Sequence, residues 1–264
     1  MTWKPRLIAL DIDGTLTREG TETISPAVRA AVGRAVDHGA TVVLSTGRSL
    51  IGTTPIADDL GLRGTTAICS NGAVWWDTDS REVVHRDVFD TAPVLDVLRR
   101  ELPGGVYASE VTGVGNIAVG TFPDGDLWGE VHQVDFAALA AHPTSRLVVR
   151  WLDRTPEQLA LQLLDLDLPG VTPSIDHGVA WLTLTAPGVT KGSALERLRA
   201  RLGVSESDTL AIGDGHNDEA MLRWAARGVA MGQAPATVHA VADAVTATVL
   251  EDGAALELDR WFAP

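Results

Sequence analysis

The sequence predicts an α/β protein in which a doubly wound parallel sheet is interrupted by an inserted α+β domain. Near the start of the chain, short apolar runs alternate with segments of helical periodicity, and the same alternation returns in the last third. Between them, residues 82–186 contain strand-like stretches that follow one another with little helix between. Strands alternating with helices are typical of parallel sheets. We therefore expect a core domain of residues 1–81 and 187–264 and an inserted domain of residues 82–186.

The N-terminal segment begins with a buried strand. The run from Arg6 to Leu10 is short, apolar on both faces and ends at Asp11, which suits a parallel strand covered by helices on both sides. A helix should start at Pro26, because Ser25 can cap its N-terminus and proline favours the first helical position. Further strands are expected at residues 40–44 and 66–70.

The later part of the chain repeats this pattern. The expected elements are a helix at 191–202, a strand at 209–212, a helix at 217–226 and strands at 228–231 and 244–246.

Within the insert, one helix is expected at 156–164, with strands at 146–151 and 179–184. Alternation along the strand at 146 places Arg146, Val148, Arg150 and Leu152 on one face and Leu147, Val149 and Trp151 on the other. One of these faces must pack on helices of the insert.

The composition excludes several classes of protein. The 264 residues include 21 Lys and Arg against 35 Asp and Glu, a net charge of −14, so a nucleic-acid backbone is repelled. The single cysteine, Cys69, excludes an intramolecular disulfide and a cysteine-based zinc site. No apolar run reaches the roughly 18–20 residues that span a bilayer, and the first apolar stretch ends in two aspartates, unlike a signal peptide. We expect a cytoplasmic monomer or small homo-oligomer that binds neither nucleic acid nor membrane.

Three polar clusters directly follow predicted parallel strands, at residues 11–15, 45–48 and 213–218. Ligands bind at the carboxyl ends of the strands in open α/β sheets, so these segments should converge on one site. The carboxylates that would then crowd together are those of Asp11, Asp13, Asp214 and Asp218. Like charges at close range stay ionised only when something neutralises them. Mg²⁺, held by one or two carboxylates and a substrate phosphate, fits this need.

The same segments resemble the motifs of the haloacid dehalogenase-like phosphohydrolases. Asp11-Ile12-Asp13-Gly14-Thr15 resembles the first motif, and Thr46 in Leu44-Ser45-Thr46-Gly47-Arg48 resembles the second. Lys191 in Gly188-Val189-Thr190-Lys191-Gly192 resembles the third, and Gly213-Asp214-Gly215-His216-Asn217-Asp218 the fourth. The large insert between the second and third motifs is similar to the Cof-like type IIB subfamily. This resemblance implies a Rossmann-like core with an inserted α+β cap that selects the substrate.

The resemblance also implies a role for each matching residue. Asp11 would attack phosphorus to form an aspartyl-phosphate, and Asp13 would protonate the leaving group and later activate water. Thr46 and Lys191 would bind the phosphoryl group and neutralise its charge. The residues that would hold Mg²⁺ are Asp11, Asp13 through its backbone carbonyl, and Asp214, with support from Asp218 or Asn217. The residues that would bind substrate or phosphate are Gly14, Gly47, Arg48, Asn71, Gly72 and Asn217.

We expect a Mg²⁺-dependent hydrolase of small phosphomonoesters, such as sugar phosphates or related metabolites. Two alternatives stay open: a phosphosugar mutase with the same aspartyl-phosphate, and a non-catalytic sugar-phosphate sensor. In the insert, Arg150 could pair with a second anionic group of the substrate or remain solvated, and Trp151 or Trp181 could line a ring pocket or pack in the core. The roles of Gln233 and Thr183 stay open, since relatives commonly carry Asn and an acidic residue at these positions.

Overall fold

A five-stranded parallel sheet lies at the centre of the first of two units in the computed structural model, which describes residues 3–18, 21–176 and 178–263. Neighbouring strands all run parallel, with Leu7 opposite both Thr41 and Thr209. The strands, in order across the sheet, are β14 (Ala244–Val245), β13 (Arg227–Ala230), β12 (Thr209–Gly213), β1 (Leu7–Leu10) and β2 (Thr41–Leu44). Because the strands are parallel, the residues that follow β1, β2 and β12 emerge at one edge.

Helices cover both faces of this sheet, as expected for a doubly wound fold. Ile8 and Leu10 of β1 pack in the layer formed by α1 (Pro26–Asp37), α2 (Leu50–Asp59) and α9 (Gly253–Phe262). Leu7 and Ala9 point to the opposite layer, formed by α6 (Lys191–Leu202), α7 (Glu219–Trp224) and α8 (Ala236–His239). The predicted N-terminus of α1 is confirmed, because Ser25 Oγ accepts a hydrogen bond from the Val28 N–H at 3.1 Å.

The third predicted parallel strand differs from the expectation. β3 (Thr66–Cys69) meets the parallel sheet through one bridge, Ser45 to Ile68. It pairs antiparallel with β4 (Val74–Asp77), which pairs with β5 (Val83–Arg86). The expected domain boundary between residues 81 and 82 falls inside this hairpin, because β5, which lies beyond that boundary, pairs with β4. The chain leaves the first unit only after Arg86.

The second unit is built on a six-stranded sheet, which is antiparallel except where β7 and β8 run parallel. Its strands, in order, are β10 (Thr172–Ile175), β11 (Trp181–Thr185), β9 (Leu147–Trp151), β6 (Gly105–Val111), β7 (Gly115–Val119) and β8 (Glu130–Gln133). The predicted helix is present as α5 (Pro156–Leu163). The expectation of one helix was incomplete, since α3 (Ala92–Glu101) and α4 (Phe136–Ala140) are also present.

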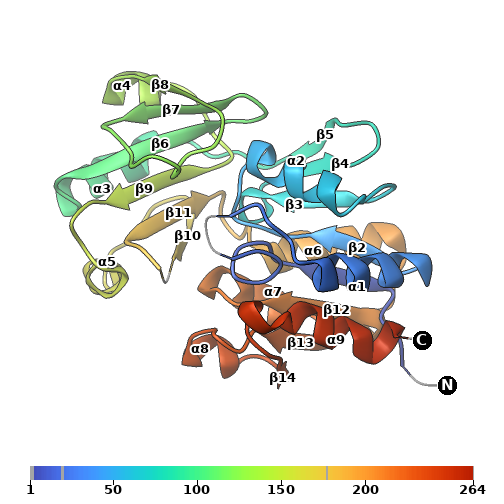
Figure 1. The fold of residues 1–264 in the computed structure, drawn as a ribbon. Helices are drawn as coiled ribbons and strands as arrows, with labels where there is room; N and C mark the ends of the chain where they lie inside the picture. Colours follow the sequence, from blue (N-terminus) through green and yellow to red (C-terminus); the bar gives the residue numbers. More distant parts are fainter. Residues whose placement is uncertain (1–2, 19–20, 177, 264) are drawn as a thin grey trace.

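One face of the second sheet packs on these helices and the other is turned toward the first unit. Leu147, Val149 and Trp151 of β9 lie in the same apolar cluster as residues of α3, α4 and α5. Trp151 therefore packs in the core, and its Nε1 donates to the carbonyl of Pro103 at 2.9 Å. Val148, on the opposite face, belongs to a separate small cluster. Figure 1 shows the two units side by side, with α3 and α5 on the outer side of the second sheet.

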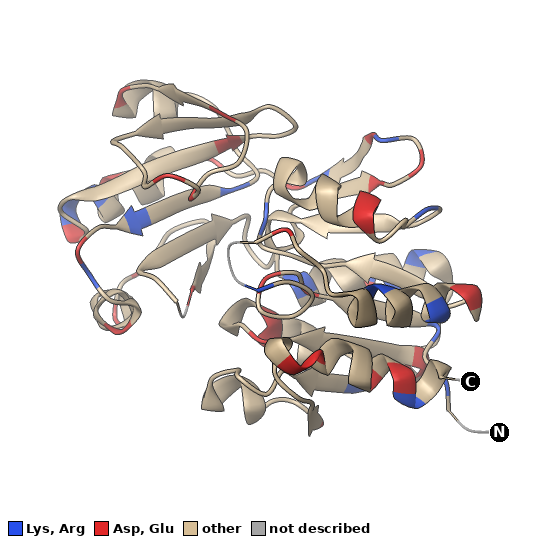
Figure 2. Cartoon of the chain, in the orientation of Figure 1, with Lys and Arg blue, Asp and Glu red and all other residues tan. Residues whose placement is uncertain are grey.

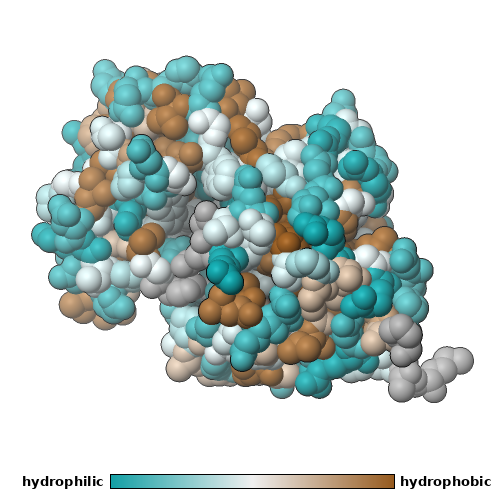
Figure 3. All heavy atoms as spheres, in the orientation of Figure 1, coloured by the Kyte–Doolittle hydropathy of each residue, from teal (hydrophilic) through white to brown (hydrophobic). Residues whose placement is uncertain are grey.

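Charged residues of both signs are distributed over both units in Figure 2. On the face drawn in Figure 3, hydrophobic residues occur in small groups separated by hydrophilic ones. No helix among residues 3–18, 21–176 and 178–263 combines the length and the apolar character that a membrane crossing requires.

Candidate active site

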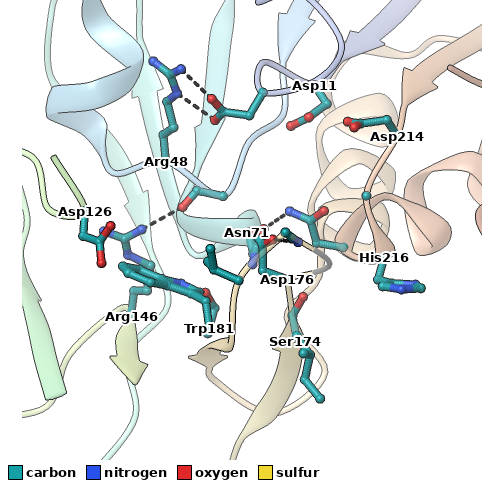
Figure 4. Close-up of a pocket in the computed structure, with 18 of the residues that line it drawn as sticks. Asp11, Arg48, Asn71, Asp126, Arg146, Ser174, Asp176, Trp181, Asp214 and His216 are labelled. Atoms are coloured by element: carbon teal, nitrogen blue, oxygen red, sulfur yellow. Dashed lines mark hydrogen bonds and ion pairs between the residues drawn. The ribbon is translucent and has the colours of Figure 1, made fainter. Parts of the chain in front are cut away.

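A cavity of about 440 Å³ lies where the carboxyl edge of the parallel sheet meets the second unit (Figure 4). The first unit contributes the predicted site residues Asp11, Asp13, Gly47, Arg48, Asn71, Asp214 and Asn217. From the second unit come what we call the insert wall, Asp126, Trp128, Arg146, Trp181 and Thr183, and beside it Gly125, Ser174, Ile175, Asp176, Gly178 and Val179. Segments that are far apart in the sequence therefore converge as the strand order predicts.

A buried lysine joins two of the predicted carboxylates. Lys191 is the first residue of α6, where its charge opposes the helix dipole. Its Nζ donates to Asp11 Oδ1 at 2.7 Å and to Asp218 Oδ1 at 2.5 Å, and its side chain is fully buried. The other carboxylate oxygen of Asp218 accepts from the backbone N–H groups of Asp214 and Gly215, both at 2.9 Å. Asp218 therefore holds both the lysine and the loop that carries Asp214.

Asp214 is placed by two neighbours that the sequence did not link to it. Thr15 Oγ1 donates to its Oδ1 at 3.2 Å, and Gln233 Nε2 lies 3.4 Å from its Oδ2. The Gln233 amide also donates to the carbonyl of Gly14 at 2.6 Å, so the longer side chain reaches the site. Gly14 has φ +73, and a Cβ there would lie 2.0 Å from Asp214 Oδ2. Only a residue without a side chain allows this approach.

The protonation of these groups reflects their crowding. Burial, together with the charge of Asp218, raises the pKa of Asp11 well above its ordinary value, and Lys191 opposes this shift. The same two causes raise the pKa of Asp214 to about 7. Burial alone would lower the pKa of Lys191, but the carboxylates of Asp11 and Asp218 raise it, so the lysine remains charged. One ammonium group does not compensate the carboxylates around it.

This arrangement fits a divalent metal ion. Asp11, Asp214 and Asp218 are buried and can each offer one carboxylate oxygen, all within 4.8 Å of one another. All the donors are oxygen, which Mg²⁺ and Ca²⁺ prefer. The raised pKa values of Asp11 and Asp214 show that negative charge at this place lacks compensation. Asp13 is not in this group of described residues, and its backbone carbonyl remains a predicted ligand.

The carboxylate of Asp13 is bound by Arg48. Arg48 Nε donates to Asp13 Oδ2 at 2.8 Å and Nη2 donates to Oδ1 at 2.6 Å (Figure 4). Arg48 also donates to the backbone carbonyls of Gly52 and Thr21. The guanidinium predicted to bind phosphate thus holds Asp13 at the cavity, where a third of the Asp13 side chain stays exposed.

The remaining predicted residues form a loop network beside Asp11. Thr46 is fully buried, its Oγ1 accepts from the Arg48 N–H at 3.1 Å, and its carbonyl accepts from the Asn71 N–H at 2.9 Å. Asn217 Nδ2 donates to Asn71 Oδ1 at 3.0 Å. Gly72, at φ +110, packs against α6, because a Cβ there would lie 2.5 Å from the Thr190 carbonyl. Contact of these groups with a phosphoryl oxygen stays a prediction.

Sequence reasoning missed several groups on the side of the second unit. Glu110 is buried on β6, accepts from Ser70 Oγ at 2.6 Å and lies 3.1 Å from Arg146 Nε. Asp126 and Trp128 come from the loop that follows β7 and line the cavity. A charged residue within the otherwise apolar run of β6 was the one available indication.

The fold and the site together define a class. A buried aspartate directly after the first parallel strand is paired with a buried lysine, and further carboxylates lie beside it, so this is an α/β protein with an acidic site, suited to a metal ion, at the carboxyl edge of its sheet.

The chain belongs to the haloacid dehalogenase-like hydrolase family, whose family model matches residues 8–100 and 162–258. It is therefore a phosphatase of this superfamily.

Similar proteins span nearly the whole chain. The 5-amino-6-(5-phospho-D-ribitylamino)uracil phosphatase YcsE of Bacillus subtilis is 31% identical over 260 residues, which cover 97% of this chain and 95% of that protein. The pyridoxal phosphate phosphatase YbhA of Escherichia coli is 28% identical over 255 residues, covering 91% and 92% of the two chains. A solved subclass IIB sugar phosphatase shares the fold with a TM-score of 0.81 at 24% identity, covering 97% and 98%.

Proposed function

We propose that this protein is a Mg²⁺-dependent phosphatase that hydrolyses small phosphomonoesters through an aspartyl-phosphate on Asp11, in the cytoplasm. The observation that carries this proposal is the contact of Lys191 with both Asp11 and Asp218 in a buried, strongly acidic site. The charge of Lys191 favours the ionised form of Asp11 and so opposes the effect of burial on its pKa, and a nucleophile must be ionised. The pKa of Asp11 is raised when no metal is bound, and a metal ion beside its carboxylate would lower that pKa and favour the ionised form.

The residues of this chain supply the two half-reactions. A carboxylate oxygen of Asp11 attacks phosphorus, and the bond from phosphorus to the leaving oxygen breaks while Asp13 gives that oxygen a proton. Water then attacks the phosphorus of the aspartyl-phosphate, Asp13 takes its proton, and inorganic phosphate leaves. Mg²⁺, held by Asp11, Asp214 and the Asp13 carbonyl, would neutralise charge on the phosphoryl group.

Arg48 gives Asp13 its position in this scheme. Its two hydrogen bonds to the Asp13 carboxylate, at 2.8 and 2.6 Å, fix the plane of that group beside the cavity. Arg48 is itself 6% exposed and is held by the carbonyls of Thr21 and Gly52. A carboxylate held in one orientation loses little entropy when the substrate binds, and in this ionised form Asp13 is suited to take the proton of the attacking water.

The second unit, residues 87–186, would act as the cap that selects the substrate. The cavity is closed on one side by its insert wall, whereas the first unit supplies the groups for phosphate and metal. The relatives named above act on a phosphorylated ribitylaminouracil and on pyridoxal phosphate, which are small phosphorylated molecules. We propose a substrate of this size, a sugar phosphate or a related metabolite.

Release of inorganic phosphate from a panel of phosphorylated metabolites tests the proposal, with p-nitrophenyl phosphate as a generic substrate. We expect Mg²⁺-dependent release by the native protein and a loss of at least about 1000-fold in Asp11→Asn, because an amide is a poor nucleophile. Asp79→Asn, a change at an exposed hairpin residue, is the matched control. Isomerised sugar phosphate without net release would instead indicate a mutase, and binding without turnover would indicate a sensor.

A further inference from the structure

The insert wall lines the cavity opposite the predicted phosphate and metal residues, where the leaving group of a substrate would lie. Two arginines on the open face of the second sheet, Arg146 and Arg150, are the candidates for binding a second anionic group. The cavity side of this face also carries Asp126. The charge that a substrate meets there depends on how these arginines are paired.

The guanidinium of Arg146 already has two partners within the protein. Its Nε lies 3.1 Å from Glu110 Oε2, and its Nη1 donates to the carbonyl of Gly47 at 2.8 Å. Glu110 is the cross-strand neighbour on β6, its side chain is 1% exposed, and it also accepts from Ser70 Oγ. Recruiting Arg146 to a substrate anion would leave a buried carboxylate without its cation, which is strongly unfavourable.

Arg150 is paired with a carboxylate that faces the cavity. Its Nε lies 3.5 Å from Asp126 Oδ2. Asp126 lines the cavity, whereas Arg150 is not among the described residues that line it. An incoming anion therefore meets the carboxylate before the guanidinium. Figure 4 shows Asp126 and Arg146 on the same side of the cavity, so the wall carries both a carboxylate and a guanidinium.

The other members of the insert wall are uncharged, and Asp176, which lines the cavity beside them, adds a second carboxylate from this unit. Trp181 Nε1 donates to Thr183 Oγ1 at 3.0 Å, which satisfies the indole locally and leaves its ring to line the cavity. Trp128 lines the cavity as well, and its ring lies 5.2 Å from the Arg48 guanidinium. Aromatic faces of this kind suit the apolar faces of a sugar or a ring.

We propose that the insert wall selects phosphomonoesters whose leaving group is uncharged and hydroxylated, and that Asp126 discriminates against a leaving group with a second negative charge. This inference rests on the proposed phosphatase function and specifies its substrate class. A carboxylate beside a guanidinium offers an acceptor and a donor to neighbouring hydroxyl groups, whereas an added anion is repelled by Asp126. Arg146 and Arg150 are balanced by Glu110 and Asp126, and Asp176 adds one more negative charge at the cavity, so the net charge that an added anion meets is negative.

Matched pairs of esters test this inference. Sorbitol 6-phosphate and 6-phosphogluconate differ only in a hydroxymethyl or a carboxylate at one end, and glycerol 3-phosphate and 3-phosphoglycerate differ in the same way. We expect kcat/KM for phosphate release to favour the uncharged member of each pair by at least about tenfold, the effect of one like charge in a partly solvated site. The inhibition constant of each ester against p-nitrophenyl phosphate hydrolysis is measured in parallel. For esters that are not hydrolysed, these constants show whether the uncharged member of a pair binds more tightly.

Two variants test whether Asp126 causes the preference for uncharged esters. Asp126→Asn should reduce the preference to less than about threefold, mainly by improving kcat/KM for the carboxylate ester, because Arg150 then lacks its partner. Asp124→Asn, on the same loop but exposed and outside the cavity lining, should leave the preference unchanged. Equal kcat/KM within the pairs, or an unchanged preference in Asp126→Asn, would overturn the inference while phosphate release continues. No release from any ester, p-nitrophenyl phosphate included, would overturn the proposed function and this inference with it.

Discussion

Replacing Asp214 with asparagine should stabilise the metal-free protein although it removes a predicted metal ligand. The side chain is 3% exposed, and burial next to Asp218 raises its pKa from 3.8 to about 7. A pKa raised in the folded state means that the ionised group destabilises the fold: this penalty is complete above about pH 7 and shrinks as the pH falls from 7 toward 4. Each pKa unit corresponds to about 1.4 kcal/mol, so the penalty near pH 8 is at most about 4 kcal/mol.

Asparagine keeps the shape of Asp214 and removes the charge. One of the contacts with Thr15 and Gln233 then meets an N–H group instead of an oxygen, which costs about 1 kcal/mol. We expect a net gain of about 1–3 kcal/mol in the free energy of unfolding, measured by urea denaturation in chelator near pH 8. In Mg²⁺ the native protein should become the more stable of the two, since it gains roughly 4 kcal/mol at 1,000 times the dissociation constant and the variant gains little.

Asp218→Asn is the matched control, because the same chemical change there removes hydrogen bonds that exist without metal. Asp218 accepts from Lys191 Nζ and from two backbone N–H groups, and it is fully buried. In chelator this variant should lose about 3–5 kcal/mol, as expected when one partner of a buried ion pair is removed. A loss of stability in both variants, or full Mg²⁺ stabilisation of Asp214→Asn, would refute the assignment of uncompensated charge to Asp214.

Four further outcomes are expected. Asp13→Asn should lower kcat for an alkyl phosphate by about 100-fold or more, and less for p-nitrophenyl phosphate, whose leaving group needs no proton; equal losses would contradict the role of Asp13 as acid. Ca²⁺ should compete with Mg²⁺ without supporting phosphate release, because it takes carboxylates through both oxygens; equal rates with the two metals would count against Asp11 as both ligand and nucleophile. The dissociation constant for Mg²⁺, measured by calorimetry, should increase as the pH falls through 7, since a proton then competes for Asp214; a constant value between about pH 6 and 8 would contradict this. Burial raises the pKa of the Cys69 thiol to about 12, so iodoacetamide should label it in urea and not in the folded protein, as mass spectrometry can measure.

The sequence alone determined the parallel core and the place of its chemistry. Short runs such as Leu7–Leu10 are apolar on both faces, and this local property specifies a strand buried between two helical layers. Asp11, Thr46 and Asp214 follow such runs closely, and all strands of a parallel sheet end at one edge. Their convergence therefore needed no knowledge of side-chain contacts. The cap of α1 by Ser25 was equally local.

Only the tertiary structure decided which partner each charged group has. Asp13 could have faced the metal or solvent, and it is bound by Arg48, 35 residues away. Arg146 and Glu110 meet because β9 and β6 are neighbours in the second sheet. The hairpin of β4 and β5, which extends the first unit to Arg86, likewise depends on pairing between strands. Local periodicity describes which faces of a segment are apolar, whereas pairing of charges and strands depends on how distant segments pack, which no local pattern contains.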